Sequence, residues 1–142
     1  MDEQTTPWIE ELLSFWFGAL SDETKLDREV DPFRTHMQRW YGKEPDVDRQ
    51  IRERFEPTLR SVTRSAESWA LAEQATSGHV RSQLALTLLV DQLPRNMYRD
   101  TQRMYGYDGL GLVHAYRALP ALRDGSLTLL ERCSRSCQSL AF

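Results

Sequence analysis

Residues 84–108 read LALTLLVDQLPRNMYRDTQRMYGYD and carry the strongest structural signal in the chain. An apolar run from Leu84 to Val90, interrupted by one threonine, is followed at once by charged and amide side chains. A helical run that is apolar all round is usually buried all round. We therefore predict a central buried helix over about 79–92. The polar groups that follow it should lie at the margin of the core, where an unpaired charge is costly.

Pro94 interrupts the helical pattern directly after this run, because proline cannot donate a helical hydrogen bond. We expect the chain to turn there and the polar side chains around it to converge on one small region. These candidate binding residues are Asp91, Gln92, Arg95, Asn96 and Arg99. We predict that Asp91 makes a charge-assisted contact with one of the arginines. At least one of the arginines should be reachable from solvent.

The spacing of the arginines allows two interpretations. Arg95, Arg99 and Arg103 would share one face of a continuous helix, and three guanidiniums could clamp a phosphate or a carboxylate. The alternative is a ladder of salt bridges with nearby carboxylates, namely Asp91, Asp100 and Asp108. Asp91 and Gln92 could also act as a base with an orienting amide. A lone Asp at a helix end more often only accepts hydrogen bonds.

Outward from this stretch, start and stop signals predict helices along the whole chain. Pro57 should kink or split one of them, and the glycines at 106, 109 and 111 suggest close packing or a local break. No run alternates as a strand does. The expected helices cover about 7–17, 32–41, 46–62, 69–75, 79–92, 101–119 and 127–132. The predicted fold is all-α, with antiparallel helical hairpins in a single domain over 1–142.

The predicted core gathers the large apolar residues at helical spacing: Trp16, Phe55, Leu86, Leu89, Val90 and Leu93. Trp at such spacing usually belongs to a core. Trp16 and Trp40 are nevertheless also candidates for lining a common groove.

Composition excludes several classes of protein. The chain has 142 residues and a net charge of −3, which argues against a dedicated nucleic-acid binder. Its start is acidic, so we expect no secretory signal, and no apolar run in the sequence reaches the length of a membrane span. We expect a soluble, cytoplasmic protein with free thiols at Cys133 and Cys137.

Signatures of metal and cofactor binding are missing from the sequence. His36, His79 and His114 lie far apart, and no metal-ligand pattern, nucleophile elbow or phosphate loop is present. We predict no metal and no cofactor. The catalytic residues, if the protein is an enzyme, stay unassigned.

Three segments resemble one known family. SFWFGAL at 14–20, RWYGKEPDVDRQIRERFEPTL at 39–59 and the stretch at 84–108 are similar to the segments of DUF924, a bacterial and fungal family of uncharacterised proteins. The resemblance covers roughly residues 12–132. It implies an all-helical array similar to tetratricopeptide (TPR) hairpins and implies no established activity.

Two departures from the family pattern stand out. Asp100 occupies a position where the family usually has glycine. After LLER at 129–132 the chain continues as CSRSCQSLAF, which is polar and unlike the family. We expect residues 133–142 to form a loose tail, as a truncated or frameshifted reading of the gene would produce.

Two functional hypotheses follow from these observations. In the first, the protein is a helical scaffold that binds a small anionic ligand or a peptide in a concave groove. In the second, it is an unrecognised, hydrolase-like small-molecule enzyme that uses the DQLPRN motif, with Asp91, Arg95 and Asn96 in the site. Full pairing of Arg95 and Arg99 by protein groups would favour the scaffold. An open pocket beside a carboxylate or histidine would favour the enzyme.

Overall fold

The computed structural model of the protein describes residues 6–18, 20 and 24–123, and every regular element within these ranges is a helix. In chain order they are α1 (Thr6–Phe17), α2 (Phe33–Tyr41), α3 (Pro45–Val62), α4 (Ala66–Thr76), α5 (Val80–Asp91), α6 (Leu93–Met97), the 3-10 helix η1 (Gln102–Tyr105) and α7 (Asp108–Arg123). The all-α prediction is confirmed. The antiparallel, TPR-like ordering of the hairpins stays a prediction.

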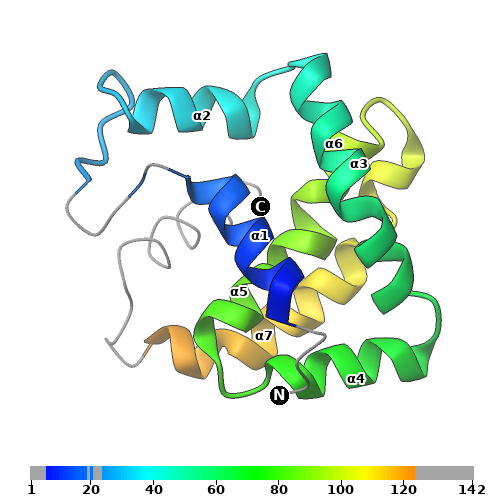
Figure 1. Cartoon of the computed structure of the whole chain (residues 1–142). Helices are drawn as coiled ribbons and strands as arrows, with labels where there is room; N and C mark the ends of the chain where they lie inside the picture. The colour runs from blue at the N-terminus through cyan, green and yellow to red at the C-terminus, as the bar shows by residue number, and fades with distance from the viewer. Residues whose placement is uncertain (1–5, 19, 21–23, 124–142) are drawn as a thin grey trace.

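Helix α5 is the centre of the molecule. Every residue from Leu84 to Val90 is buried, as predicted for an apolar run. Helices α1, α3, α4, α6 and α7 all contact α5, and Figure 1 shows α1 lying across it and α7 running beside it. The predicted core residues are all buried, namely Trp16, Phe55, Leu86, Leu89, Val90 and Leu93. The neighbouring helices lie where they cover the apolar surface of α5.

Two glycines end helices at the predicted places. Gly18 follows α1 with φ +41° and donates its N–H to the carbonyl of Ser14, as a left-handed cap does. Gly42 follows α2, where a Cβ atom would collide with the carbonyl oxygen of Gln38. Only glycine fits there without a shift of the backbone.

Two predicted helices have different boundaries in the structure. Helix α3 runs from Pro45 to Val62 and contains Pro57, so of the two predicted effects of this proline the split does not occur, and the kink stays a prediction. The single helix predicted over 101–119 is divided into η1 and α7, with Gly106 between them. Helix α7 then continues past Pro120 to Arg123. The other predicted helices up to residue 92 are present with small changes at their ends.

Gly111 is a point of close packing between α5 and α7. A Cβ atom added at this glycine would lie 3.3 Å from Cβ of Asp91 and 3.5 Å from a methyl group of Val90. The sequence signal of a glycine inside a helix therefore reflects close approach here.

Some expectations concern residues outside the described ranges. The helix predicted over 127–132 and the tail predicted over 133–142 both lie there. Among the helices that the structure describes, none combines the length and apolar character needed to cross a membrane.

A turn after α6 explains one departure from the family pattern. The N–H of Thr101 donates to the carbonyl of Tyr98 over 3.0 Å, and Asp100 occupies the third position of this turn with φ +63°. A turn that needs positive φ at its third position favours glycine. Asp tolerates the left-handed region better than most residues, but its Cβ still costs about 1–2 kcal/mol there.

Replacing Asp100 with glycine should therefore stabilise the protein. We expect Asp100→Gly to raise the free energy of unfolding by up to about 1 kcal/mol, because relief of the strain exceeds the extra chain entropy of glycine. Equilibrium urea unfolding measures the change. Asp100→Ala keeps the Cβ and is the control. If alanine stabilises as much as glycine, backbone strain is not the cause.

Candidate functional site

The polar motif that follows α5 is divided between two clusters. In the first, Asp91 is only 3 % exposed and accepts a 2.5 Å hydrogen bond from the side chain of Gln92. Arg95 Nη2 lies 3.9 Å from Asp91 but 3.3 Å and 3.4 Å from the two oxygens of Asp108. The guanidinium also lies over the ring of Tyr105. The predicted contact of Asp91 with an arginine is thus a long ion pair without a hydrogen bond.

The environment of Asp91 favours its neutral form. Burial raises the pKa of this carboxyl above its usual value, and the negative charge of Asp108 acts in the same direction. The hydrogen bond from Gln92 and the charge of Arg95 oppose the rise. A carboxyl with a raised pKa can serve as a general acid. Asp91 is too buried for a substrate to contact it in this conformation.

The second cluster joins α6 and the turn after it to the start of α3. Arg99 donates to both oxygens of Asp48, from Nε over 2.7 Å and from Nη2 over 3.1 Å. Nη2 also donates to the carbonyl of Gly42 over 3.1 Å, and Asn96 donates to Asp48 over 3.0 Å. We call these residues, Gly42, Asp48, Asn96 and Arg99, the Asp48 clamp. The hydrogen bond with Asp48 raises the pKa of Arg99.

The sequence analysis did not single out Asp48, although it accepts three hydrogen bonds in the clamp. The expected ladder contained Asp91, Asp100 and Asp108 instead. Asp48 and Arg99 are 51 residues apart, so no local spacing links them. Both do lie in segments that carry the family resemblance, which was the one available signal.

The motif arginines point in three directions. Arg95 contacts Asp108 of α7, Arg99 contacts Asp48 of α3, and Arg103 lies over the ring of Tyr98 at 4.3 Å. The prediction of a common face was wrong because the helix ends at Met97, before Arg99. The five candidate polar residues therefore do not converge on one region.

A pocket of about 290 Å³ opens beside the Asp48 clamp. Its lining comes from α3, α6 and the turn that follows α6. The lining residues are Pro45, Asp48, Arg49, Arg52, Asn96, Met97 and Arg99. Arg52 reaches across this pocket and donates to the carbonyl of Met97. Arg99 keeps 23 % of its side chain exposed, so the prediction of an arginine reachable from solvent is confirmed.

Trp16 and Trp40 come together, but within the core. Their rings stack at 5.9 Å with an interplanar angle of 17°, and Trp40 Nε1 donates to the carbonyl of Trp16 over 2.8 Å. They are 2 % and 5 % exposed. Neither lines the pocket beside the Asp48 clamp, so their contribution here is to packing.

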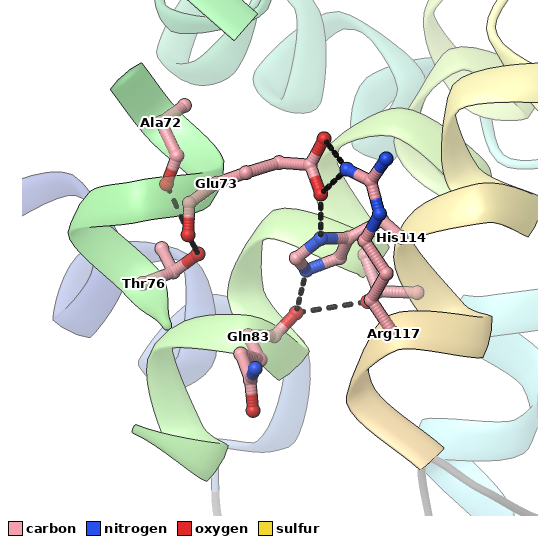
Figure 2. Close-up of polar contacts among 7 residues, drawn as sticks. Ala72, Glu73, Thr76, Gln83, His114 and Arg117 are labelled. Carbon is pink, nitrogen blue, oxygen red and sulfur yellow. Dashed lines mark hydrogen bonds and ion pairs between the residues drawn. The ribbon is translucent and has the colours of Figure 1, made fainter. Parts of the chain in front are cut away.

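A third polar cluster joins α4, α5 and α7 (Figure 2). Both carboxylate oxygens of Glu73 on α4 accept a hydrogen bond from Nη1 of Arg117, each over 2.5 Å. One of these oxygens, Oε2, also lies 3.5 Å from Nδ1 of His114. The other ring nitrogen of His114 lies 3.1 Å from the carbonyl oxygen of Gln83 and must carry a proton to donate to it. The sequence analysis treated His114 as an ordinary histidine, since nothing local links it to Glu73.

The pKa of Glu73 reflects opposing effects. Burial raises it, while hydrogen bonds from Arg117 and His114 and their charges lower it, and the net result is a pKa below the ordinary value of 4.5. The carboxylate therefore stabilises the fold when it is charged. No three His, Cys, Asp or Glu side chains gather as metal ligands within the part of the chain that the structure describes.

The Asp48 clamp should show strong energetic coupling. We expect a double-mutant cycle of Asp48→Asn and Arg99→Gln to give a coupling energy of about 1–3 kcal/mol, because the pair is largely buried and hydrogen-bonded. Urea unfolding of the four proteins measures it. The exposed pair Glu10–Arg81, at 3.1 Å, is the control and should couple by about 0–1 kcal/mol. Equal coupling in both cycles would show that the clamp adds nothing beyond a surface pair.

Loss of the Glu73 charge should matter only above acidic pH. We expect Glu73→Gln to lower the free energy of unfolding by about 1 kcal/mol at pH 7, a modest value because Arg117 is well exposed. Because the folded pKa is depressed, the difference from the wild type should be complete above pH 4.5 and shrink as the pH falls below that value. Urea unfolding from pH 7 to pH 3.5 tests this. Glu53→Gln, on an exposed part of α3, controls for charge removal.

Comparison with known proteins gives one match. No curated protein and no solved structure matches the chain. A family model described as "Bacterial protein of unknown function (DUF924)" matches residues 12–137. The match starts where the sequence resemblance starts and extends past residue 132 into the segment expected to differ. Because it covers most of the chain, the protein belongs to the DUF924 family.

Proposed function

We propose that the protein is a binding module for a small organic anion, with the pocket beside the Asp48 clamp as its site. The observation that carries the proposal is the composition of the lining. Three guanidiniums, of Arg49, Arg52 and Arg99, face this pocket together with the single carboxylate of Asp48. Arginine is suited to such sites because its planar fork matches carboxylate and phosphate oxygens.

The charge balance favours an anion even after internal pairing. Asp48 neutralises Arg99, and Arg49 lies 3.1 Å from Asp46. Arg52 donates to a neutral carbonyl instead, so its positive charge has no carboxylate partner among the contacts of the described residues. A ligand carboxylate or phosphate would supply that partner. The volume of about 290 Å³ lies at the lower end of the range for small-molecule sites.

Arg99 lines an open pocket beside the carboxylate of Asp48, which taken alone would favour the enzyme hypothesis, but the chemistry of the whole lining favours binding over catalysis. The residues around the pocket include no serine, cysteine, histidine or tyrosine to act as a nucleophile or a proton shuttle. The oxygens of the Asp48 carboxylate already accept hydrogen bonds from Asn96 and Arg99, so they are occupied by protein donors. The enzyme hypothesis placed Asp91, Arg95 and Asn96 in one site, whereas Arg95 contacts Asp108 of α7 and Asn96 contacts Asp48 of α3.

A thermal-shift screen of small carboxylates and phosphate esters tests the proposal. A ligand that binds the folded state raises the melting temperature by mass action. We expect a compound that stabilises the wild type to bind at least tenfold more weakly to Arg52→Gln. Arg60→Gln is the matched control, because it removes the same charge from a site farther along α3. A screen without any hit, or a hit that Arg52→Gln binds as well as the wild type does, would refute the proposal.

A further inference from the structure

The guanidinium groups of two arginines from different helices lie over the ring of Phe15 on α1. Arg39 of α2 has its Cζ atom 4.2 Å from the ring centre, and Arg54 of α3 has its Cζ atom 5.1 Å from it. The edge of the ring system is packed against Phe55 at 5.6 Å, and Phe15 is 7 % exposed. Three helices thus bring two guanidiniums to one aromatic side chain near the surface.

These two arginines share the ring of Phe15, and neither of them has a carboxylate partner within the described part of the chain, as is also true of Arg52. Most described arginines have a carboxylate within 4.0 Å, as do Arg34, Arg49, Arg60, Arg81, Arg95, Arg99 and Arg117. No such ion pair holds Arg39 or Arg54 among the described residues. Burial and then the positive charge of Arg54 lower the pKa of Arg39, against a weaker attraction to Glu44. The fold therefore holds two like charges together without a carboxylate between them.

We propose that Arg39 and Arg54 form a binding site for a phosphate group, as inorganic phosphate or as the phosphate monoester of a small molecule. The face of an aromatic ring offsets only about 0.5–1 kcal/mol per cation at an exposed site. A phosphate dianion matches two guanidinium charges, and its tetrahedral oxygens can meet two planar forks from different directions. A carboxylate carries one charge and two coplanar oxygens, so it satisfies one fork.

This site is separate from the pocket beside the Asp48 clamp. Arg52 lines that pocket, and Arg54 lies two residues farther along the same helix. Residues two apart on a helix do not face each other. Arg39 belongs to α2 and does not line the pocket. The phosphate proposal therefore stands or falls independently of the proposed function.

Isothermal titration calorimetry with inorganic phosphate tests the site. Chloride is added so that the ionic strength stays constant. We expect Arg39→Gln and Arg54→Gln each to weaken phosphate binding at least tenfold. Arg64→Gln, which removes an exposed arginine just after α3, should bind phosphate as the wild type does. Equal weakening in Arg64→Gln would show a bulk charge effect and overturn the proposal, as would wild-type affinity in Arg39→Gln or Arg54→Gln.

The melting temperatures of the variants, measured without phosphate, provide a second test. Each of the two glutamine variants should keep or raise the melting temperature, because it relieves repulsion between like charges. A marked fall in both would mean that the arginines serve packing, and would overturn the proposal. Arg39→Lys, which keeps the charge and loses the fork, should also bind phosphate more weakly.

Two further titrations define the ligand. Acetate should bind at least tenfold more weakly than phosphate, and equal affinity would overturn the assignment to a dianion. Methyl phosphate binding more tightly than inorganic phosphate supports a monoester as the ligand. The reverse order supports free phosphate. If the wild type binds phosphate no better than chloride, the site does not exist.

Discussion

Burial of α5 from Leu84 to Asp91 is the constraint on which the rest of the structure depends. A helix that is apolar on all sides must be covered on all sides, and here five other helices contact it. The neighbouring helices need only one apolar face each, so their opposite faces carry the charges. The arrangement of the surface clusters thus follows from how the chain wraps one segment.

The same constraint explains how the charges at the end of α5 are satisfied. The chain leaves the core in a short stretch that contains Asp91, Arg95 and Arg99. An unpaired charge costs considerable free energy at this margin. The backbone changes direction at Gln92 and again after Met97, so these groups cannot pair along one face. Partners come from other helices instead, Asp108 from α7 and Asp48 from α3. Pairing at the margin of the core thereby connects three elements.

Local physical chemistry explains which parts of the fold the sequence could predict. Apolar periodicity identified the helices and the buried residues, and glycine and proline marked several ends correctly. Pro57 does not split α3, because the helix tolerates one missing hydrogen bond when its buried face is well packed. The break at Gly106 was suggested by its glycine but not located. Asp48 and Glu73 were missed for one reason, since their partners are far away in sequence and only the tertiary fold brings them close.

Gly111 also bears on how the protein can evolve. A Cβ atom there would lie 3.3 Å from Cβ of Asp91, so a larger residue requires α5 or α7 to shift by a few tenths of an ångström. The displacement would be carried along α7 to His114 and Arg117, whose partner Glu73 sits on α4. Variation at this one position is therefore constrained by contacts that it does not itself make. Replacing this glycine during evolution would therefore favour compensating substitutions on more than one helix.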